Sequence, residues 1–191
     1  MEVANFTVLY DACVFYPAPL RDFLIGLATT DLFRARWTDH IHEEWTRNLL
    51  AHRPDLSKKQ LLRTRQLMDQ AVEGCLVRGY ERLIDSLTLP DPDDRHVLAA
   101  AIRAGAEVIV TFNQRDFPSE ILQKFSITTE HPDDFVVNLV DINGEAVIDA
   151  ARDQRARLKN PPKSRQEFLD ILYRQHLTRT VTFLQDRIDL L

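Results

Sequence analysis

Three acidic residues within four positions open the segment DPDDRHVLAAA, and an alanine-rich apolar stretch follows them directly. The proline after Asp91 suits the first position of a helix, which makes Asp91 the N-cap. Asp94 then shares one helix face with Val97, Leu98 and Ala101, at i+3, i+4 and i+7. Because the cap is already supplied by Asp91, we interpret Asp94 as an inward-facing carboxylate with a functional role.

A second inward-facing acid is predicted in the segment HIHEEWTRNLL. Ile41, Trp45 and Leu49 recur at i, i+4 and i+8 and form its apolar stripe. Glu44 follows Ile41 by three residues and borders that stripe, whereas Glu43 is rotated by about 200° from Ile41. Glu44 is therefore the better candidate for a site.

Two further acids follow predicted strands. Asp11 ends the apolar run VANFTVLY, and Asp116 lies in the loop NQRDFP, just after the strand EVIVTF. Thr111 and Asn113 place polar side chains at the end of that same strand. In open α/β sheets, ligands bind beyond the carboxyl ends of the strands, so these residues are candidates for one site.

Four carboxylates brought together would repel one another and destabilise the fold unless a cation neutralised them. The four are Asp11, Glu44, Asp94 and Asp116. Oxygen-only ligation favours the hard cations Mg²⁺ and Mn²⁺. Such a site suits phosphodiester hydrolysis, in which a metal lowers the pKa of a bound water and stabilises the charge on the phosphate.

The elements that would position these acids alternate between strands and helices. This alternation predicts an α/β layer architecture with a mainly parallel sheet. We expect strands at 3–10, 35–37, 107–112 and 126–129, and helices at 19–29, 39–52, 56–74, 92–105, 119–125 and 131–140.

From about residue 138 the pattern changes to helices alone. Two helical segments, 143–159 and 164–191, are separated by the break NPPKS. We therefore divide the chain into a catalytic domain, 1–137, and a C-terminal helical extension, 138–191.

The composition is that of an ordinary globular protein, with 45% hydrophobic residues and a net charge of −5 among 191 residues. This charge argues mildly against a protein that mainly coats nucleic acid. Two cysteines give neither a disulfide framework nor a zinc ligand set. No apolar run approaches the roughly 20 residues of a membrane span, and the N-terminus does not look like a secretory signal. We expect a cytoplasmic protein that does not bind membranes.

Two basic runs stand out against this acidic background. One covers residues 47–66, and the other consists of Arg152, Arg155, Arg157, Lys159, Lys163 and Arg165. Each run has two interpretations, a solvated helix face or a patch that attracts phosphate. For the second run we retain RNA binding as a hypothesis.

Four segments, LYDACVFY, EEWTRNLL, LPDPDDRHVLAAAI and VIVTFNQRDFP, resemble in order the four acidic motifs of the PIN-domain nuclease family. The resemblance covers roughly residues 5–137. It implies a three-layer αβα sandwich around a parallel sheet, and Mg²⁺- or Mn²⁺-dependent cleavage of RNA that leaves a 5′-phosphate and a 3′-hydroxyl. Carried over to this chain, the metal-binding and catalytic acids are Asp11, Glu44, Asp94 and Asp116, supported by Thr111, Asn113 and Asp91.

Many small prokaryotic members of this family resemble VapC, the toxin of toxin–antitoxin pairs. The resemblance thus implies an endoribonuclease toxin that acts on RNA, forms a homodimer and is silenced by a cognate antitoxin. The family pattern does not cover the extension, so dimerisation, antitoxin binding and RNA binding remain open as its role.

Three competing interpretations are less consistent with the residues. An aspartyl phosphatase using Asp11 would commonly need a second acid two residues later, where this chain has Cys13. A nucleophilic Cys13 has no evident histidine partner. An inactive PIN-like module that binds RNA or protein is the main alternative. A degenerate member would be expected to have lost acids, and all four are present.

Overall fold

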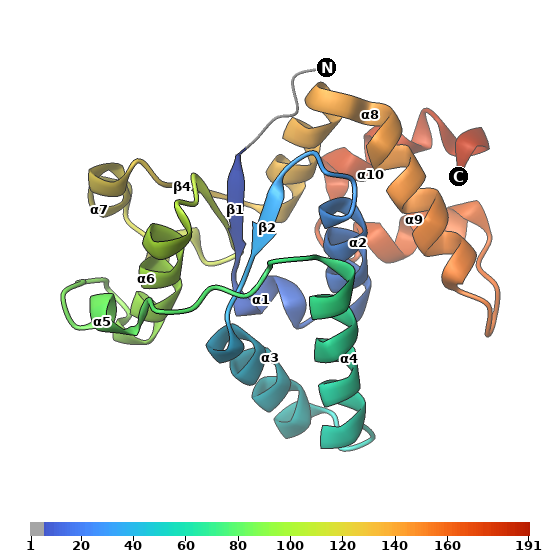
Figure 1. The fold of residues 1–191 in the computed structure, drawn as a ribbon. Coiled ribbons are helices and arrows are strands. Elements are labelled where there is room, and N and C mark those ends of the chain that lie inside the picture. The colour runs from blue at the N-terminus through green and yellow to red at the C-terminus, as the bar shows by residue number, and fades with distance from the viewer. Residues whose placement is uncertain (1–5) are drawn as a thin grey trace.

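The computed structural model of this chain describes residues 6–191, so the start of the strand predicted at 3–10 lies outside the described residues. Four strands form one all-parallel sheet in the order β2-β1-β3-β4 (Figure 1). They are β1 Thr7–Tyr10, β2 Arg34–Arg36, β3 Val108–Val110 and β4 Thr128–Glu130. The predicted α/β class with a parallel sheet is confirmed.

The sheet order brings the ends of two strands together. β1 lies between β2 and β3, and every residue of β1 and β3 is buried, as expected for parallel strands that are covered on both faces. The chain leaves β1 toward one side of the sheet and later returns to add β3 on the other side. The carboxyl ends of β1 and β3 therefore flank a topological switch point, where open α/β sheets bind ligands.

Helices cover both faces of the sheet and complete three layers. In Figure 1, α6 and α7 lie to the left of the strands, α2, α9 and α10 lie to the right, and α3 and α4 extend below. The helices are α1 Ala12–Phe15, α2 Ala18–Ala28, α3 Asp39–His52, α4 Lys58–Ala71, α5 Glu81–Ile84, α6 Arg95–Ala104, α7 Ser119–Leu122, α8 Pro132–Arg157, α9 Arg165–Tyr173 and α10 Thr178–Gln185. Across residues 6–191, no helix is both long and apolar enough to cross a membrane.

An aromatic cluster fixes the end of β1 next to Asp11. The buried ring of Tyr10 contacts Phe15, Phe33, Trp37 and Phe135, with centroid distances of 5.6 to 6.4 Å. The Tyr10 hydroxyl donates to the backbone oxygen of Leu24 at 3.3 Å. Burial raises the pKa of this hydroxyl well above its usual value, so it stays a neutral donor. Rigid packing here holds the strand end in place.

Helix α8 crosses the predicted boundary between residues 137 and 138. The two helices expected at 131–140 and 143–159 are joined into one helix with a kink at Asn143, where φ is −157° and ψ is 89°. The side-chain oxygen of Asn143 accepts the backbone N–H of Ala146 at 3.1 Å and thus caps the second half. The division into 1–137 and 138–191 stays a prediction.

The helix expected at 164–191 is interrupted. The chain turns between α9 and α10 through His176, whose φ of 63° is left-handed. The α10 N-terminus is capped from α8, because the buried Asp133 accepts the N–H groups of Arg179 and Thr180 at 2.8 and 2.9 Å. Its carboxylate also accepts the hydroxyls of Thr178 and Thr180. This cap docks the end of the extension onto the rest of the protein.

Candidate active site

Asp11 lies at the carboxyl end of β1 and caps the short helix α1. Its carboxylate is 3% exposed and accepts the N–H of Ala12 at 2.6 Å, the hydroxyl of Thr111 at 2.7 Å and the thiol of Cys13 at 3.2 Å. Burial raises the pKa of Asp11, and the hydrogen bonds from Thr111 and Cys13 oppose that rise. Since Thr111 follows β3, its hydroxyl ties the two central strand ends together.

Asp94 is the half-buried member of the acidic triplet, while Asp91 and Asp93 are exposed. A 3₁₀ turn, Pro92–Asp94, precedes α6, and Asp91 caps it by accepting the N–H of Asp93 at 2.8 Å. Asp91 thus caps this turn and not α6, which begins at Arg95, three residues later than expected. Asp94 occupies the N-cap position of α6, but its side chain accepts no hydrogen bond from the described residues at the start of that helix.

The pKa of Asp94 shows that the acids act on one another. Burial, followed by the charges of Asp11, Asp116, Asp91 and Glu44, raises the pKa of Asp94 to about 7. None of the ion pairs among the described residues involves Asp11, Asp94 or Asp116. Asp11, Asp116, Asp91 and Glu44 therefore lie near enough to Asp94 for their negative charges to act on it.

Glu44 projects from α3 and has a partner that sequence reasoning missed. The Nε2 atom of His96 lies 3.4 Å from the Glu44 carboxylate. The His96 ring is buried and stacks on His40 at a centroid distance of 3.8 Å. The periodicity of α6 places His96 on another face than Asp94, and only the packing of α6 against α3 shows that this face meets Glu44.

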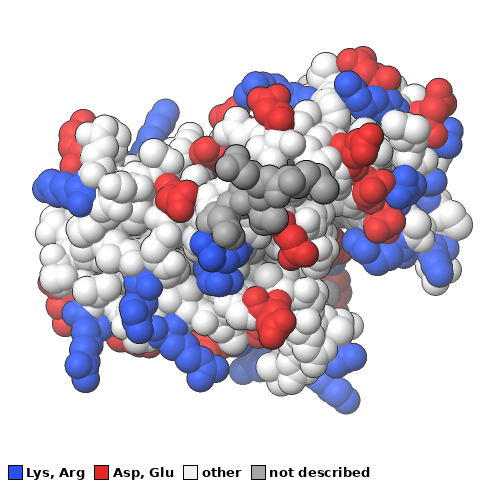
Figure 2. Space-filling model, turned by 45° about the horizontal axis from the view of Figure 1, so that its top comes forward, with Lys and Arg blue, Asp and Glu red and all other residues white. Residues whose placement is uncertain are grey.

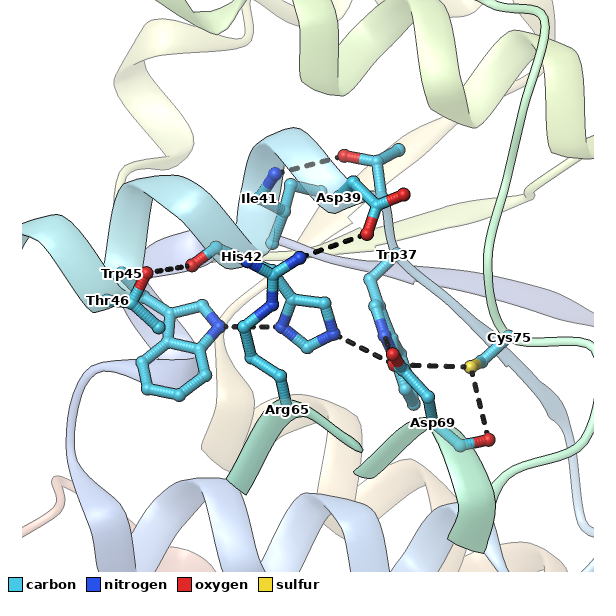
Figure 3. Close-up of polar contacts among 10 residues, drawn as sticks. Trp37, Asp39, Ile41, His42, Trp45, Thr46, Arg65, Asp69 and Cys75 are labelled. Atoms are coloured by element: carbon cyan, nitrogen blue, oxygen red, sulfur yellow. Dashed lines mark hydrogen bonds and ion pairs between the residues drawn. The ribbon is translucent and has the colours of Figure 1, made fainter. Parts of the chain in front are cut away.

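A buried polar network anchors α3, the helix that carries Glu44 (Figure 3). Trp45 Nε1 donates to His42 Nδ1 at 3.0 Å, so the neutral His42 ring carries its proton on Nε2. That nitrogen lies 2.8 Å from Asp69 Oδ1 on α4, and Trp37 Nε1 donates to the same oxygen at 2.9 Å. Burial lowers the pKa of His42, which keeps the ring neutral. These contacts pin α3 to α4 and to the end of β2.

Asp116 and Asn113 lie in the loop that follows β3. Asp116 ends the 3₁₀ turn Gln114–Asp116, and its N–H donates to the backbone oxygen of Asn113 at 3.0 Å. The N–H of Asn113 donates to the Thr111 hydroxyl at 2.9 Å, and that hydroxyl donates to Asp11. Thr111 thus connects the loop to the buried carboxylate, while the Asn113 side chain is exposed.

The donor chemistry of these residues fits a hard divalent cation. All four side chains offer carboxylate oxygens, and their mutual repulsion leaves negative charge for a cation to neutralise. Within residues 6–191, however, no three acidic, cysteine or histidine side chains are placed close enough to share one ion. Metal binding would therefore require the carboxylates to draw closer together.

Cys13 contributes structure rather than nucleophilic chemistry. Its sulfur contacts the Asp11 carboxylate, lies 3.3 Å from the Thr111 hydroxyl and accepts the N–H of Phe112 at 3.3 Å. Burial and the charge of Asp11 raise the pKa of the Cys13 thiol well above its usual value. The thiolate is thus disfavoured at neutral pH, which speaks against the cysteine-nucleophile interpretation.

A hollow of about 420 Å³ opens beside the acids. Its lining residues are Ala12, Cys13, Tyr16, Glu44, Asn48, His52 and Asn113. A larger hollow, of about 660 Å³, lies between α3 and α4 and includes none of the four predicted metal ligands. Of these two hollows, the smaller one is therefore lined by a predicted metal ligand, Glu44.

Two arginines of the basic run in the extension hydrogen-bond backbone oxygens of the protein itself. Arg155 donates to the backbone oxygens of Lys163 and Leu191 at 3.0 and 3.3 Å, and Arg165 donates to that of Leu191 at 2.8 Å. Leu191 itself is buried. These two arginines therefore hold the C-terminal residue in place.

The other members of the run are more open to solvent. Arg152 pairs with Asp149 at 2.7 Å, and Arg157 and Lys159 are exposed. On the face that Figure 2 shows, lysine and arginine side chains are interspersed with acids and do not form a single basic stripe. Of the six predicted RNA-binding residues, Arg157 and Lys159 are best placed to meet a ligand.

Comparison with known protein families matches residues 7–115 to the PIN domain and residues 132–186 to the VapC50 C-terminal domain. The chain is 39% identical over 97 residues to the protein named "Putative ribonuclease VapC50" of Mycobacterium tuberculosis (strain ATCC 25618 / H37Rv). That similarity covers 51% of this chain and 57% of the relative. No solved structure gave a significant match.

The PIN-domain match contains Asp11, Glu44, Asp94 and the loop that leads to Asp116, and it covers more than half of the chain. The parallel sheet, its switch point and the acids gathered there agree with that match. The chain belongs to the PIN-domain family.

Proposed function

We propose that this protein is a Mg²⁺- or Mn²⁺-dependent endoribonuclease. The observation that carries the proposal is the grouping of acids around Asp94, which has no paired cation among the described residues. Burial, and then the charges of four other acids, raise the pKa of this half-buried carboxyl. If these acids bound no metal and took no part in catalysis, their mutual repulsion would lower the stability of the fold with nothing to offset it. The printed name of the similar protein, a ribonuclease, supports RNA as the substrate.

In this proposal Asp11, Asp94, Asp116 and Glu44 hold the cation. A bound Mg²⁺ or Mn²⁺ supplies an activated water and stabilises charge on the phosphate and the leaving oxygen. Thr111 favours the ionised form of Asp11 by donating to it, and His96 orients Glu44. Asn113 supports Asp11 through its backbone N–H, which donates to the Thr111 hydroxyl, and Asp91 supports Asp94 by capping the turn that carries it. Water attack on the phosphodiester leaves a 5′-phosphate and a 3′-hydroxyl.

We further propose the biological setting of a toxin–antitoxin pair. The toxin would be a cytoplasmic homodimer that cleaves RNA and is silenced by a cognate antitoxin. Residues 1–137 would form the catalytic domain, and residues 138–191 the helical extension. The similarity to a protein named VapC50 and the match of residues 132–186 to the VapC50 C-terminal domain support this setting.

Cleavage of end-labelled single-stranded RNA tests the activity. Purified protein is incubated with RNA and Mg²⁺, Mn²⁺ or EDTA, and the product ends are identified. The proposal predicts cutting with either metal, none with EDTA, and products that carry 5′-phosphate. Cutting that persists in EDTA, or products with a 2′,3′-cyclic phosphate, would contradict it.

An inactive RNA- or protein-binding module is the second candidate. One observation favours it, since no three potential ligands within residues 6–191 stand close enough to share an ion. RNA binding without cleavage in either metal would support this candidate over the nuclease.

A further inference from the structure

The hollow beside the acids is built by two helices and one loop. Helix α3 contributes Glu44, Asn48 and His52, which follow one another at i, i+4 and i+8 and so lie on one helix face. The end of α1 contributes Tyr16, and the loop after β3 contributes Asn113. Glu44 is shared with the predicted metal site, so the hollow begins where the proposed chemistry takes place.

Aromatic rings line the part of the hollow away from the acids. Tyr16 and His52 contact each other edge to face, with centroids 6.3 Å apart and planes at 76°. His52 is held by a 2.8 Å contact between its Nδ1 and the backbone oxygen of Asn48. Tyr16 is half-buried and packs against the core, which gives it a fixed position. A planar ligand can therefore stack here on side chains that are already in place.

Unused hydrogen-bonding groups accompany the rings. The side-chain amides of Asn48 and Asn113 form no hydrogen bond with the described residues, although both line the hollow. An amide offers both hydrogen-bond donors and an acceptor, and these can pair with the acceptors and donors along the edge of a nucleobase. The two amides thus provide groups that can read a base.

The charge of the hollow excludes a simple phosphate site. No lysine or arginine is among its lining residues, and Glu44 is an acid. A phosphate would need cations, whereas a neutral base needs ring faces and amide groups. The volume of about 420 Å³ lies within the range of roughly 300 to 1,000 Å³ that is usual for small-ligand pockets.

We propose that this hollow binds one unpaired nucleobase of the RNA, next to the phosphate that is cut. This inference rests on the proposed nuclease function and assigns a base-recognition site to it. The base stacks on the ring face of His52, the Tyr16 ring meets the base at its edge, and Asn48 and Asn113 hydrogen-bond it. Because a base inside a duplex cannot reach the hollow, the protein selects single strands or loops.

The test uses Asn48→Ala and His52→Ala, with Gln66→Ala as the matched control. Gln66 is an exposed amide on α4 and is not among the lining residues. Wild type and variants cleave a pool of random single-stranded RNA, and the bases flanking each cut are sequenced. We expect both test variants to lose the base preference at one position beside the cut and to raise KM about tenfold, as for the loss of one stacked base. Gln66→Ala should keep the wild-type pattern.

Binding measurements separate this inference from the proposed function. Each protein also carries Asp94→Asn, and its affinity is measured for two RNA oligonucleotides. One is intact, and the other lacks the base at the position beside the cut. If the wild type cuts no RNA, the base is removed at each position in turn. Loss of the base should weaken binding about tenfold in the parent and in Gln66→Ala, and much less in His52→Ala, because the stacking partner is already gone. Equal losses in all proteins would overturn the base site. If the wild type fails to cut RNA, only the nuclease function is refuted. The affinities for intact and abasic RNA would still show whether the hollow binds a base.

Discussion

At the scale of single residues, the proposed nuclease site depends on which acids are turned inward. The helical period distinguished Asp94 from Asp91 and Asp93, because spacing along a helix determines its face. The partner of Glu44 could not be derived in this way. His96 reaches Glu44 only because α6 packs near α3, and a contact between distant segments leaves no trace in the spacing of one helix.

The raised pKa of Asp94 predicts a pH-dependent stability in the absence of metal. An unfolded aspartate titrates near pH 3.9, whereas Asp94 in the fold titrates at about 7. Between these values the folded state binds more protons, so its contribution to stability is full below about pH 4 and is lost as the pH rises through about 7. Thermal melts in EDTA from pH 4 to 8 should show this decline in the wild type and a flatter curve for Asp94→Asn. Identical slopes for the two proteins would show that Asp94 is not the titrating group.

Thr111 is predicted to maintain the charge of Asp11. Thr111→Val keeps the volume but removes the 2.7 Å hydrogen bond to a carboxylate that is 3% exposed. A hydrogen bond to a charged group contributes about 1.5–3 kcal/mol, so the variant should unfold at lower urea concentration and cut RNA more slowly. Thr111→Ser retains the hydroxyl and should recover most of both properties. If the valine and serine variants behave alike, the hydroxyl is not needed.

At the scale of elements, α3 shows how much local sequence can determine. Its bounds, Asp39–His52, agree with the prediction, because Thr38 caps it by accepting the N–H of Ile41 at 3.0 Å and an apolar stripe follows. The break between α9 and α10 could not be predicted, since the acid that caps α10 is Asp133, 45 or more residues earlier in the chain. A helix end that is stabilised by tertiary contacts has no signal in its own segment.

The network of Figure 3 predicts that Asp69 stabilises the position of α3. Asp69→Ala leaves the N–H groups of Trp37 and His42 without their acceptor. Each unsatisfied buried donor costs about 1–3 kcal/mol, and urea unfolding should show a loss of that order. Asp55→Ala removes an acid from an exposed ion pair that solvent screens, and should change stability far less. Equal effects of the two substitutions would mean that the network does not stabilise α3.

At the scale of the whole molecule, the fold class and the parallel sheet followed from alternating strands and helices. The way in which the extension docks did not follow, because it depends on Asp133 and on the arginines that hold Leu191. The basic run in the sequence therefore combines structural residues with exposed ones. Periodicity and charge counts cannot tell these two groups apart.

This division predicts different effects within the basic run. Replacing Arg157 and Lys159 together by alanine should weaken RNA binding and reduce the salt dependence, by about 0.7 in the logarithmic slope for each lost phosphate contact. Replacing Arg155 should mainly lower the melting temperature, because its contacts to Lys163 and Leu191 are lost. Titration of fluorescent RNA at several salt concentrations distinguishes the two. An unchanged affinity and slope for the Arg157 and Lys159 double variant would leave that surface without a role in RNA binding.

We propose that the converging carboxylates form a metal-dependent cleavage site. Its most direct test compares RNA cleavage rates over a range of Mn²⁺ concentrations for wild type, Asp94→Asn and Asp93→Asn. The two variants lose the same charge at adjacent positions, but only Asp94 is half-buried among the other acids. We expect only background cleavage for Asp94→Asn at every Mn²⁺ concentration and near-normal cleavage for Asp93→Asn. Wild-type rates for Asp94→Asn, or equal losses in both variants, would contradict it.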